Sequence, residues 1–138
     1  MAIREEEQHR ERYDARHVLH AHEVSRAVER EAVGSDYGNT GFTTRQQADR
    51  LVDLLQLRRG DLLLDIGAGA GWPGLYLSAR SGCRVVVSDL SPTGMAEARR
   101  RAVADHMAGR THAVAATARR LPFKPEQFDA IVHSDVLC

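Results

Sequence analysis

Short apolar runs alternate with stretches of helical periodicity along the second half of the chain. The runs have the length and branched side chains of buried strands. They cover residues 62–66, 84–88, 112–115 and 129–133. Between these runs, residues from about 73 to 80 and from about 93 to 107 have the periodicity of helices. Strands separated by helices predict an α/β fold with a doubly wound parallel sheet, partial at about four strands.

The first quarter of the chain has a different pattern. Residues 4–32 are highly charged, and apolar residues recur among them at three- and four-residue steps. The recurring residues are Tyr13, Val18, Ala21, Val24 and Val28. This spacing predicts an N-terminal extension formed by an amphipathic helix, packed beside the sheet or over a ligand.

Loop-forming residues at 34–41 follow this segment and predict that the helix ends there in a loop. The next helix is expected to begin at Thr43 or Thr44. Gln46 or Gln47, three residues later, completes a capping-box pattern. The buried face of this helix is predicted to hold Leu51, Leu54 and Leu55.

Segment 62–74 joins a short apolar strand to four glycines between positions 67 and 74. Glycine accepts positive φ and lets a ligand approach the backbone without meeting a Cβ. Free N–H groups and the positive end of the following helix dipole would face that ligand. The sequence therefore predicts a nucleotide-like ligand at this turn.

Two families of ligand fit these glycines. Residues 69–74 have the Gly-x-Gly-x-x-Gly spacing of dinucleotide-binding folds, and Asp89 lies about 20 residues after the first glycine. Residues 65–71 have the spacing Asp-x-Gly-x-Gly-x-Gly and resemble motif I of the class I S-adenosylmethionine (SAM)-dependent methyltransferases. Asp65 favours SAM, because a carboxylate repels a diphosphate but attracts the ammonium and sulfonium groups of SAM.

Two later segments carry the same resemblance. Asp89 ends the second strand, where a carboxylate can accept both ribose hydroxyls; capping the next helix is its structural alternative. Residues 121–133 resemble the Leu-Pro-Phe … Phe-Asp stretch of the family, and Phe123 and Phe128 are expected to pin this loop to the core. The resemblance covers about residues 41–138. It implies a Rossmann-like fold, S-adenosyl-L-methionine as cofactor and transfer of its methyl group to a small-molecule acceptor.

The resemblance assigns roles to the residues that match the family's motifs. The residues it implies for SAM binding are Asp65, Gly67, Ala68, Gly69, Gly71, Asp89, Leu90, Thr117 and Ala118. The glycines would shape the turn around the amino-acid part of SAM, and Asp65 would hold its ammonium group, directly or through water. Asp89 would bind the ribose, Leu90 would pack on the adenine, and Thr117 with Ala118 would line the adenine edge. The family often has an aspartate where Thr117 stands, and an uncharged hydroxyl would weaken the affinity for SAM.

These patterns divide the chain into an N-terminal helix with a lid-like loop, residues 1–40, and an incomplete SAM-binding core, residues 41–138. The family's sheet has further strands, so the fourth strand is expected to be an unprotected edge that self-association or a partner would cover. Its poorly covered residues are predicted to be Ile131, Val132, Val136 and Leu137. The chain is thus interpreted as a truncated methyltransferase. A non-catalytic SAM-binding fragment and an NAD-type oxidoreductase fragment are the alternatives.

Methyl transfer from SAM depends on alignment and exclusion of water more than on side-chain chemistry. A general base is needed only if the acceptor holds its proton, and the candidates are His133 and Asp135 at the end of the fourth strand. A hydrogen-bonded structural role is the alternative for His133. Residues 37–44 resemble the loop that lies over SAM in small-molecule methyltransferases. Tyr37 or Phe42 would close the pocket there, unless the loop is an ordinary connector with an anchoring aromatic residue.

Composition argues against several other classes of function. The net charge is zero, which leaves no broad basic surface for nucleic acid. No apolar run is long enough to span a membrane, and charged residues dominate the start of the chain, unlike a signal peptide. The two cysteines, Cys83 and Cys138, lack metal-binding spacing. A cytoplasmic protein with reduced thiols is therefore expected.

Two groups of charged or titratable residues resemble binding sites but have a simpler interpretation. His17 and His20 share a helix face, but without an evident third ligand they are expected to be solvated and not to bind metal. Residues 99–101 are three consecutive arginines, which are predicted to lie on the solvated face of a helix. No metal site is expected.

Overall fold

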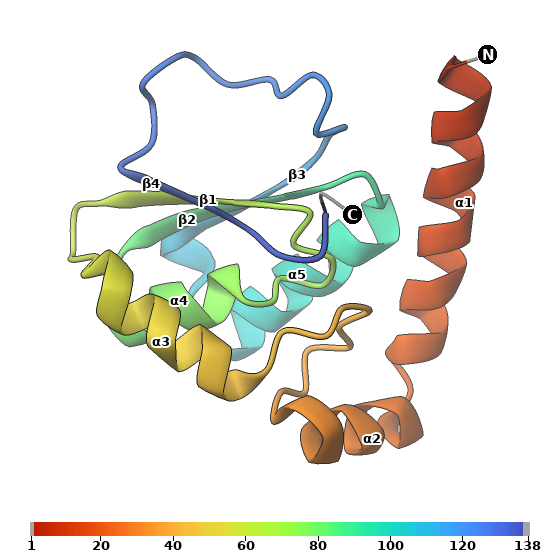
Figure 1. Cartoon of the computed structure of the whole chain (residues 1–138), viewed down its shortest axis with the longest axis horizontal. Coiled ribbons are helices and arrows are strands. Elements are labelled where there is room, and N and C mark those ends of the chain that lie inside the picture. Colours follow the sequence, from red (N-terminus) through yellow and green to blue (C-terminus); the bar gives the residue numbers. More distant parts are fainter. Residues whose placement is uncertain (1, 137–138) are drawn as a thin grey trace.

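Four parallel strands form the centre of the computed structural model, which describes residues 2–136 (Figure 1). The strands are β1 (Leu62–Ile66), β2 (Arg84–Asp89), β3 (Thr111–Ala115) and β4 (Ala130–His133). Their order in the sheet is β3-β2-β1-β4. The predicted α/β fold with a partial, doubly wound parallel sheet is confirmed, and each strand ends within one residue of the expected position.

Helices pack against one face of this sheet (Figure 1). They are α3 (Arg45–Leu55), α4 (Gly74–Ser81) and α5 (Pro92–Ala104), and the short 3-10 helix η1 (Ala108–Arg110) follows α5. Ser91 caps α5 as predicted, accepting the N–H of Gly94 at 3.0 Å. The helix ends three residues earlier than expected, because His106 has a φ of 56° and turns the chain away.

Both faces of the central strands are buried. Leu63, Val85 and Val87 belong to the core cluster that includes residues of α4 and α5. Leu64 and Val86 alternate with them and point to the other face. Residues 116–129, the blue segment between β3 and β4, run on that side of the sheet (Figure 1). Burial on both faces explains why the strands are continuous apolar runs.

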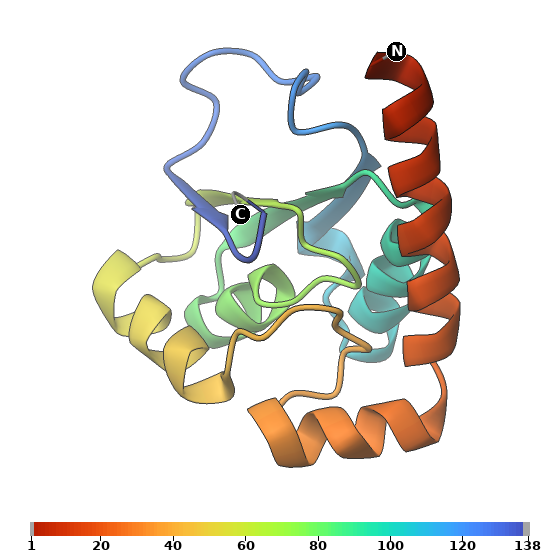
Figure 2. The ribbon, with the colours of Figure 1, turned by 45° about the vertical axis from the view of Figure 1, so that its right-hand side comes forward.

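The N-terminal extension differs from the prediction of one amphipathic helix. It consists of two helices, α1 (Ala2–His20) and α2 (Glu23–Val33), which meet at an angle (Figure 2). Much of the predicted apolar face is exposed, with exposed fractions of 77% for Val24 and 63% for Val28. His17 and Glu29 are buried in its place. Polar contacts, and not an apolar stripe, therefore set how these helices pack.

Glu29 explains the orientation of α2. Its buried carboxylate accepts a hydrogen bond from the hydroxyl of Ser35 and from the backbone N–H groups of Tyr37 (3.1 Å), Gly38 (2.8 Å) and Asn39 (3.2 Å). A buried carboxylate needs such partners, because burial without them is costly. Glu29 thereby fixes the loop at 35–39 against α2.

Tyr37 anchors the same loop in the core. It is buried, and its ring centroid lies 5.2 Å from that of Trp72. The guanidinium of Arg101 stacks 4.1 Å from the Tyr37 ring centroid and forms an ion pair with Asp36 at 2.8 Å. Of the two alternatives considered for Tyr37, the structure therefore supports the anchoring aromatic residue and not the lid. The prediction that Arg101 is a solvated side chain is wrong. Its neighbour Arg100 is exposed, as predicted.

Helix α3 begins as predicted. Thr44 accepts the N–H of Gln47 at 3.2 Å, and the Gln47 side chain accepts the N–H of Thr44 at 2.8 Å. Its buried face is only partly as expected, since Leu54 is 68% exposed and Ala48 is fully buried. The helix presents Ala48 because it packs against α4, where a small side chain allows close approach.

Strand β4 lies at the edge of the sheet, as expected. Ile131 is 56% exposed, as predicted for a poorly covered edge strand. Val132 is only 7% exposed because it points to the face that the helices cover, and the prediction that it is poorly covered is wrong. Val136 is half-buried against the glycine turn. Leu137 and Cys138 lie outside the described residues. Within residues 2–136, no helix is both long and apolar enough to cross a membrane.

The loop between β3 and β4 is held differently from the prediction. Phe123 and Phe128 pack edge to face on each other, with ring centroids 5.1 Å apart. Both are half-buried and neither belongs to the core cluster. Because the loop extends away from the helical layer, these two rings stabilise the loop itself and do not pin it to the core.

Candidate ligand-binding pocket

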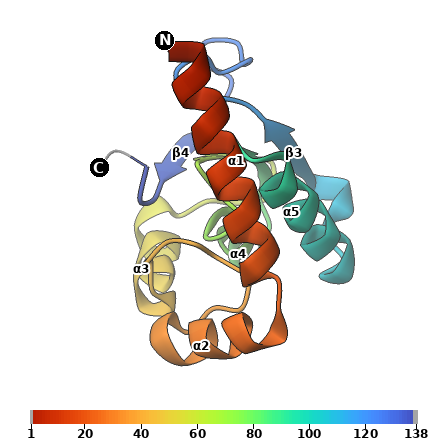
Figure 3. The ribbon, with the colours of Figure 1, turned by 90° about the vertical axis from the view of Figure 1, so that its right-hand side faces the viewer.

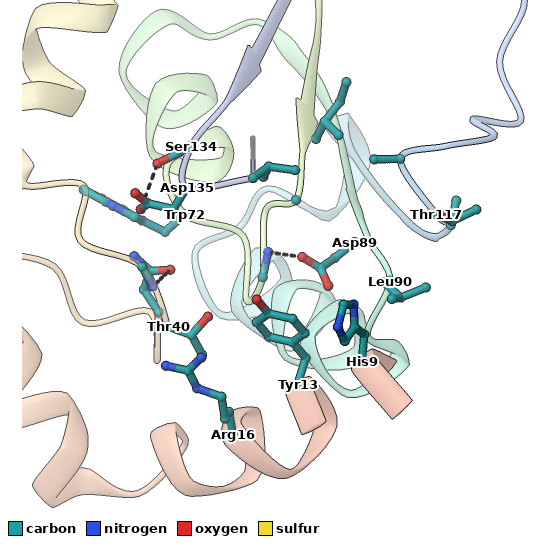
Figure 4. A pocket seen from close by; sticks show the side chains of 18 of the residues that line it. His9, Tyr13, Arg16, Thr40, Trp72, Asp89, Leu90, Thr117, Ser134 and Asp135 are labelled. Atoms are coloured by element: carbon teal, nitrogen blue, oxygen red, sulfur yellow. Dashed lines mark hydrogen bonds between the residues drawn. The ribbon is translucent and has the colours of Figure 1, made fainter. Parts of the chain in front are cut away.

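A pocket of about 680 Å³ opens at the carboxyl ends of β1 and β2 (Figure 4). Its size falls within the usual range of small-molecule sites, about 300–1,000 Å³. The lining comes from α1, the loop at 39–42, the glycine turn after β1, the end of β2, residues 116–119 and residues 134–136. Ligands of open α/β sheets gather at this edge.

The glycine turn gives the pocket its floor. Gly67 and Gly71 have φ values of 71° and 102°, in the region that favours glycine. A Cβ on Gly67 would lie 2.1 Å from Cγ2 of Val136, and a Cβ on Gly71 would lie 2.5 Å from Cδ1 of Leu75. The turn is also held by its backbone, because the N–H groups of Gly67 and Ala68 donate to the carbonyl of Ser88 at 2.7 and 3.0 Å. These glycines are therefore required for the turn itself.

Asp89 joins the turn to the start of α5. Its Oδ2 accepts the N–H of Gly69 at 2.9 Å, and its Oδ1 accepts the N–H of Ser91 at 2.8 Å. Each oxygen of a carboxylate has two lone-pair positions, so both oxygens keep capacity to accept a further donor. Asp89 is thus a rigidly held acceptor that lines the pocket.

Asp65 lies behind the turn and does not line the pocket. It is fully buried, and its Oδ2 accepts the N–H of Gly74 at 2.7 Å. Its Oδ1 has no hydrogen-bond partner within the described chain. Burial raises the pKa of this carboxyl well above its usual value of 3.8, and the neighbouring charge of Asp89 adds to the rise. The geometry gives Asp65 no direct contact with a ligand, in contrast to one of the two roles expected for it.

The raised pKa of Asp65 predicts how stability depends on pH. Because the folded chain holds this proton to a higher pH than the unfolded chain, the wild type loses free energy of unfolding as the pH rises above about 4. An Asp65→Asn variant keeps an oxygen for the N–H of Gly74 but carries no titrating proton. We expect the stability of this variant relative to the wild type to increase from pH 5 to pH 8 in urea unfolding. A constant difference across this range would contradict the prediction.

Many of the residues named from the sequence meet in the pocket. The lining contains Gly67, Gly69, Asp89, Leu90, Thr117, Ala118 and Asp135. Ala68 and Gly71 are packed behind it, where they support the turn. His133 is exposed and lines a separate, smaller hollow beside α3. The roles of all these residues toward a ligand stay predictions.

Helix α1 supplies pocket residues that the sequence analysis missed. Figure 3 shows α1 crossing in front of the sheet between β4 and β3, and its His9, Tyr13 and Arg16 line the pocket. Their spacing of four and three residues places them on one helix face. This spacing is a signal that the sequence contains, but apolar periodicity alone does not reveal it.

Two further residues of α1 dock the helix. Asp14 accepts hydrogen bonds from the hydroxyl of Ser91 and from the N–H of Thr93 at 3.1 Å, at the start of α5. His17 is only 2% exposed, and a Cβ on Gly94 would lie 2.9 Å from its Nε2. Burial lowers the pKa of His17 below its usual value of 6.5. The prediction that His17 is solvated is therefore wrong, because the imidazole packs against α5.

The loop at 39–42 and the end of β4 close the other side of the pocket. Asp135 accepts the N–H of Phe42 at 2.9 Å, which ties the two segments together. Phe42 lines the pocket although its ring is largely exposed. Trp72 stands between them and donates its indole N–H to the carbonyl of Thr43 at 2.9 Å. The pocket therefore combines a glycine floor, a fixed carboxylate and aromatic side chains.

Comparisons with known proteins show which proteins this chain resembles. A family profile described as a methyltransferase domain matches residues 63–138. The malonyl-[acyl-carrier protein] O-methyltransferase of Enterobacter lignolyticus is 33% identical over 111 residues, which cover 75% of this chain and 41% of that protein. A ubiquinone/menaquinone biosynthesis C-methyltransferase of Cereibacter sphaeroides is 34% identical over 91 residues, 65% of this chain and 36% of that protein.

A solved structure shares both sequence and fold. The SAM-dependent methyltransferase from Thiobacillus denitrificans, in complex with S-adenosyl-L-homocysteine, superposes with a TM-score of 0.59 at 27% identity. The match covers 65% of this chain and 36% of that one. The chain thus spans about two fifths of the length of the curated relatives it matches.

Proposed function

Because the chain belongs to the methyltransferase-domain family, we propose that it binds SAM in the pocket and that its protein transfers the methyl group to a small-molecule acceptor. One observation carries the proposal. The glycine turn, Asp89, Leu90 and residues 117–118, which the family resemblance singled out separately, line a single pocket. The dinucleotide alternative loses its support, since the family profile and both curated relatives are methyltransferases.

The order of groups along the pocket fits an elongated nucleoside. Figure 4 shows Leu90 and Thr117 toward one end, Asp89 in the middle and Thr40 toward the other end. Leu90 offers an apolar surface for a base, and the Thr117 hydroxyl can accept from an amino group on its edge. The tail of the nucleoside would then lie over Gly67.

Asp89 is the residue we propose for the ribose. Its two oxygens are fixed by the N–H groups of Gly69 and Ser91 and keep lone pairs for two hydroxyl donors. Charge-assisted hydrogen bonds from neighbouring hydroxyls are stronger than neutral ones. Its fixed position means that little ordering is required when the ligand binds.

The bound SAM would supply a methyl group on a positively charged sulfur. The chain's own contribution would be to hold the nucleoside and to exclude water near Trp72 and Phe42. Asp135 remains the proposed base for an acceptor that holds a proton, since it lines the pocket at this end. His133 is a poorer candidate because it lines the separate hollow. We further propose a small molecule and not nucleic acid as acceptor, because the net charge is zero.

Calorimetric titration of the purified chain tests the proposal. We expect one site for SAM and for S-adenosylhomocysteine and no heat with NAD. Binding of NAD without binding of SAM would overturn it in favour of an oxidoreductase. Formation of S-adenosylhomocysteine in the presence of candidate acceptors then separates a transferase from a SAM-binding fragment without activity.

A further inference from the structure

The face of α1 that lines the pocket carries a cation at the tail end of the site. Figure 4 shows the Arg16 side chain extending from α1 toward Thr40, while His9 lies beside Leu90 and Tyr13 stands between them. The helix is held firmly, because Asp14 binds the start of α5 and His17 is buried against it. The position of Arg16 is therefore set by the fold.

Arg16 differs from Arg26 and Arg101, which are also partly buried but form ion pairs. Arg26 forms an ion pair with Glu97 at 3.4 Å, and Arg101 pairs with Asp36 and Asp105. Arg16 is half-buried, and none of the ion pairs found within residues 2–136 includes it. Its guanidinium has a cation–π contact with Tyr13, 5.8 Å from the ring centroid. A ring does not supply the fork of acceptors that a guanidinium can bind.

The acids of the pocket are engaged elsewhere. Asp89 accepts the N–H groups of Gly69 and Ser91, and Asp135 accepts the N–H of Phe42. No ion pair joins either carboxylate to Arg16 among the described residues. A half-buried cation that faces a pocket in this way is suited to an anionic group of a ligand.

We propose that Arg16 binds a carboxylate at the end of the pocket opposite Leu90. The inference rests on the proposed function, which places a nucleoside between these two ends. Two sources can supply the carboxylate: the amino-acid tail of the SAM-type ligand itself, or an acidic methyl acceptor that lies beyond it. In both cases α1 takes part in ligand binding and is more than a structural extension.

Binding of two nucleosides to an Arg16→Gln variant tests the proposal. S-Adenosylhomocysteine carries the carboxylate, whereas 5′-methylthioadenosine has the same nucleoside and sulfur without the amino-acid tail. If the tail is the source, the variant should bind S-adenosylhomocysteine about ten- to a hundred-fold more weakly and methylthioadenosine as the wild type does. Unchanged binding of methylthioadenosine also shows that the pocket is intact. Arg12→Gln is the matched control, since Arg12 is exposed on the same helix and does not line the pocket.

An acidic acceptor is tested with malonate as the probe. The wild type loaded with S-adenosylhomocysteine should bind malonate, and the Arg16→Gln variant should lose this binding while its affinity for both nucleosides stays unchanged. If the Arg16→Gln and Arg12→Gln variants behave alike toward all three ligands, the proposal is overturned. If the wild type binds neither nucleoside, the proposed function fails first, and this inference fails with it.

Discussion

Replacing Glu29 with alanine is expected to lower the free energy of unfolding by about 2–4 kcal/mol. The substitution removes the acceptor for the hydroxyl of Ser35 and for three backbone N–H groups, at Tyr37, Gly38 and Asn39. Donors that lose a buried partner cost more than the hydrogen bonds themselves contribute. Affinity for S-adenosylhomocysteine should fall as well, because the loop at 39–42 lines the pocket.

Urea unfolding and calorimetry measure both effects. Glu31→Ala is the matched control, since Glu31 lies on the same helix with an exposed side chain. Glu29→Gln should have an intermediate effect, because an amide oxygen can accept some of the same donors. A Glu29→Ala protein as stable as the Glu31→Ala protein would show that the carboxylate does not hold the loop.

Replacing Asp89 with asparagine is expected to weaken the binding of S-adenosylhomocysteine about ten- to a hundred-fold. The amide keeps one oxygen for the N–H of Gly69 or Ser91 but carries no charge for the ribose hydroxyls. Stability should fall less than for an alanine variant, which would leave both N–H groups without an acceptor.

The same calorimetric titration measures this loss. Asp53→Asn is a suitable control, because Asp53 is exposed on α3 and lies outside the pocket. Methylthioadenosine carries the same ribose, so the Asp89→Asn variant should lose affinity for both nucleosides in parallel. Wild-type affinity in the Asp89→Asn variant would remove Asp89 from the site and leave it with the structural role of linking the glycine turn to Ser91, the N-cap of α5.

Predictions that depend on local pattern were reliable in this chain. The run at 62–66 was expected to be a strand and is one. Thr44 and Gln47 form the predicted capping box because its partners lie within one turn of helix. Gly67 has the positive φ that the turn motif requires. In each case the physical cause lies within a few residues of its effect, so the sequence contains it.

Predictions that depend on distant partners were less reliable. Val24 and Val28 repeat at helical spacing, yet they are exposed, because the opposite side of α2 carries Glu29 and its contacts with the loop. Tyr37 belongs to a loop whose residue types resemble the loop over SAM in the family, but its ring is packed between Trp72 and Arg101. Such outcomes depend on which segments meet in space, and periodicity within one segment carries no record of that.

The sequence by itself determined the four-stranded α/β core, the glycine turn and the acid that ends β2, because alternation, glycine spacing and capping act over short distances. Only the tertiary structure decided that α1 forms a wall of the pocket, with Arg16 at one end, and that Asp65 lies behind the turn. Packing Asp14 and His17 against α5 brings that wall into place. These contacts join residues more than 70 positions apart, and their free energy exists only when the whole domain has folded.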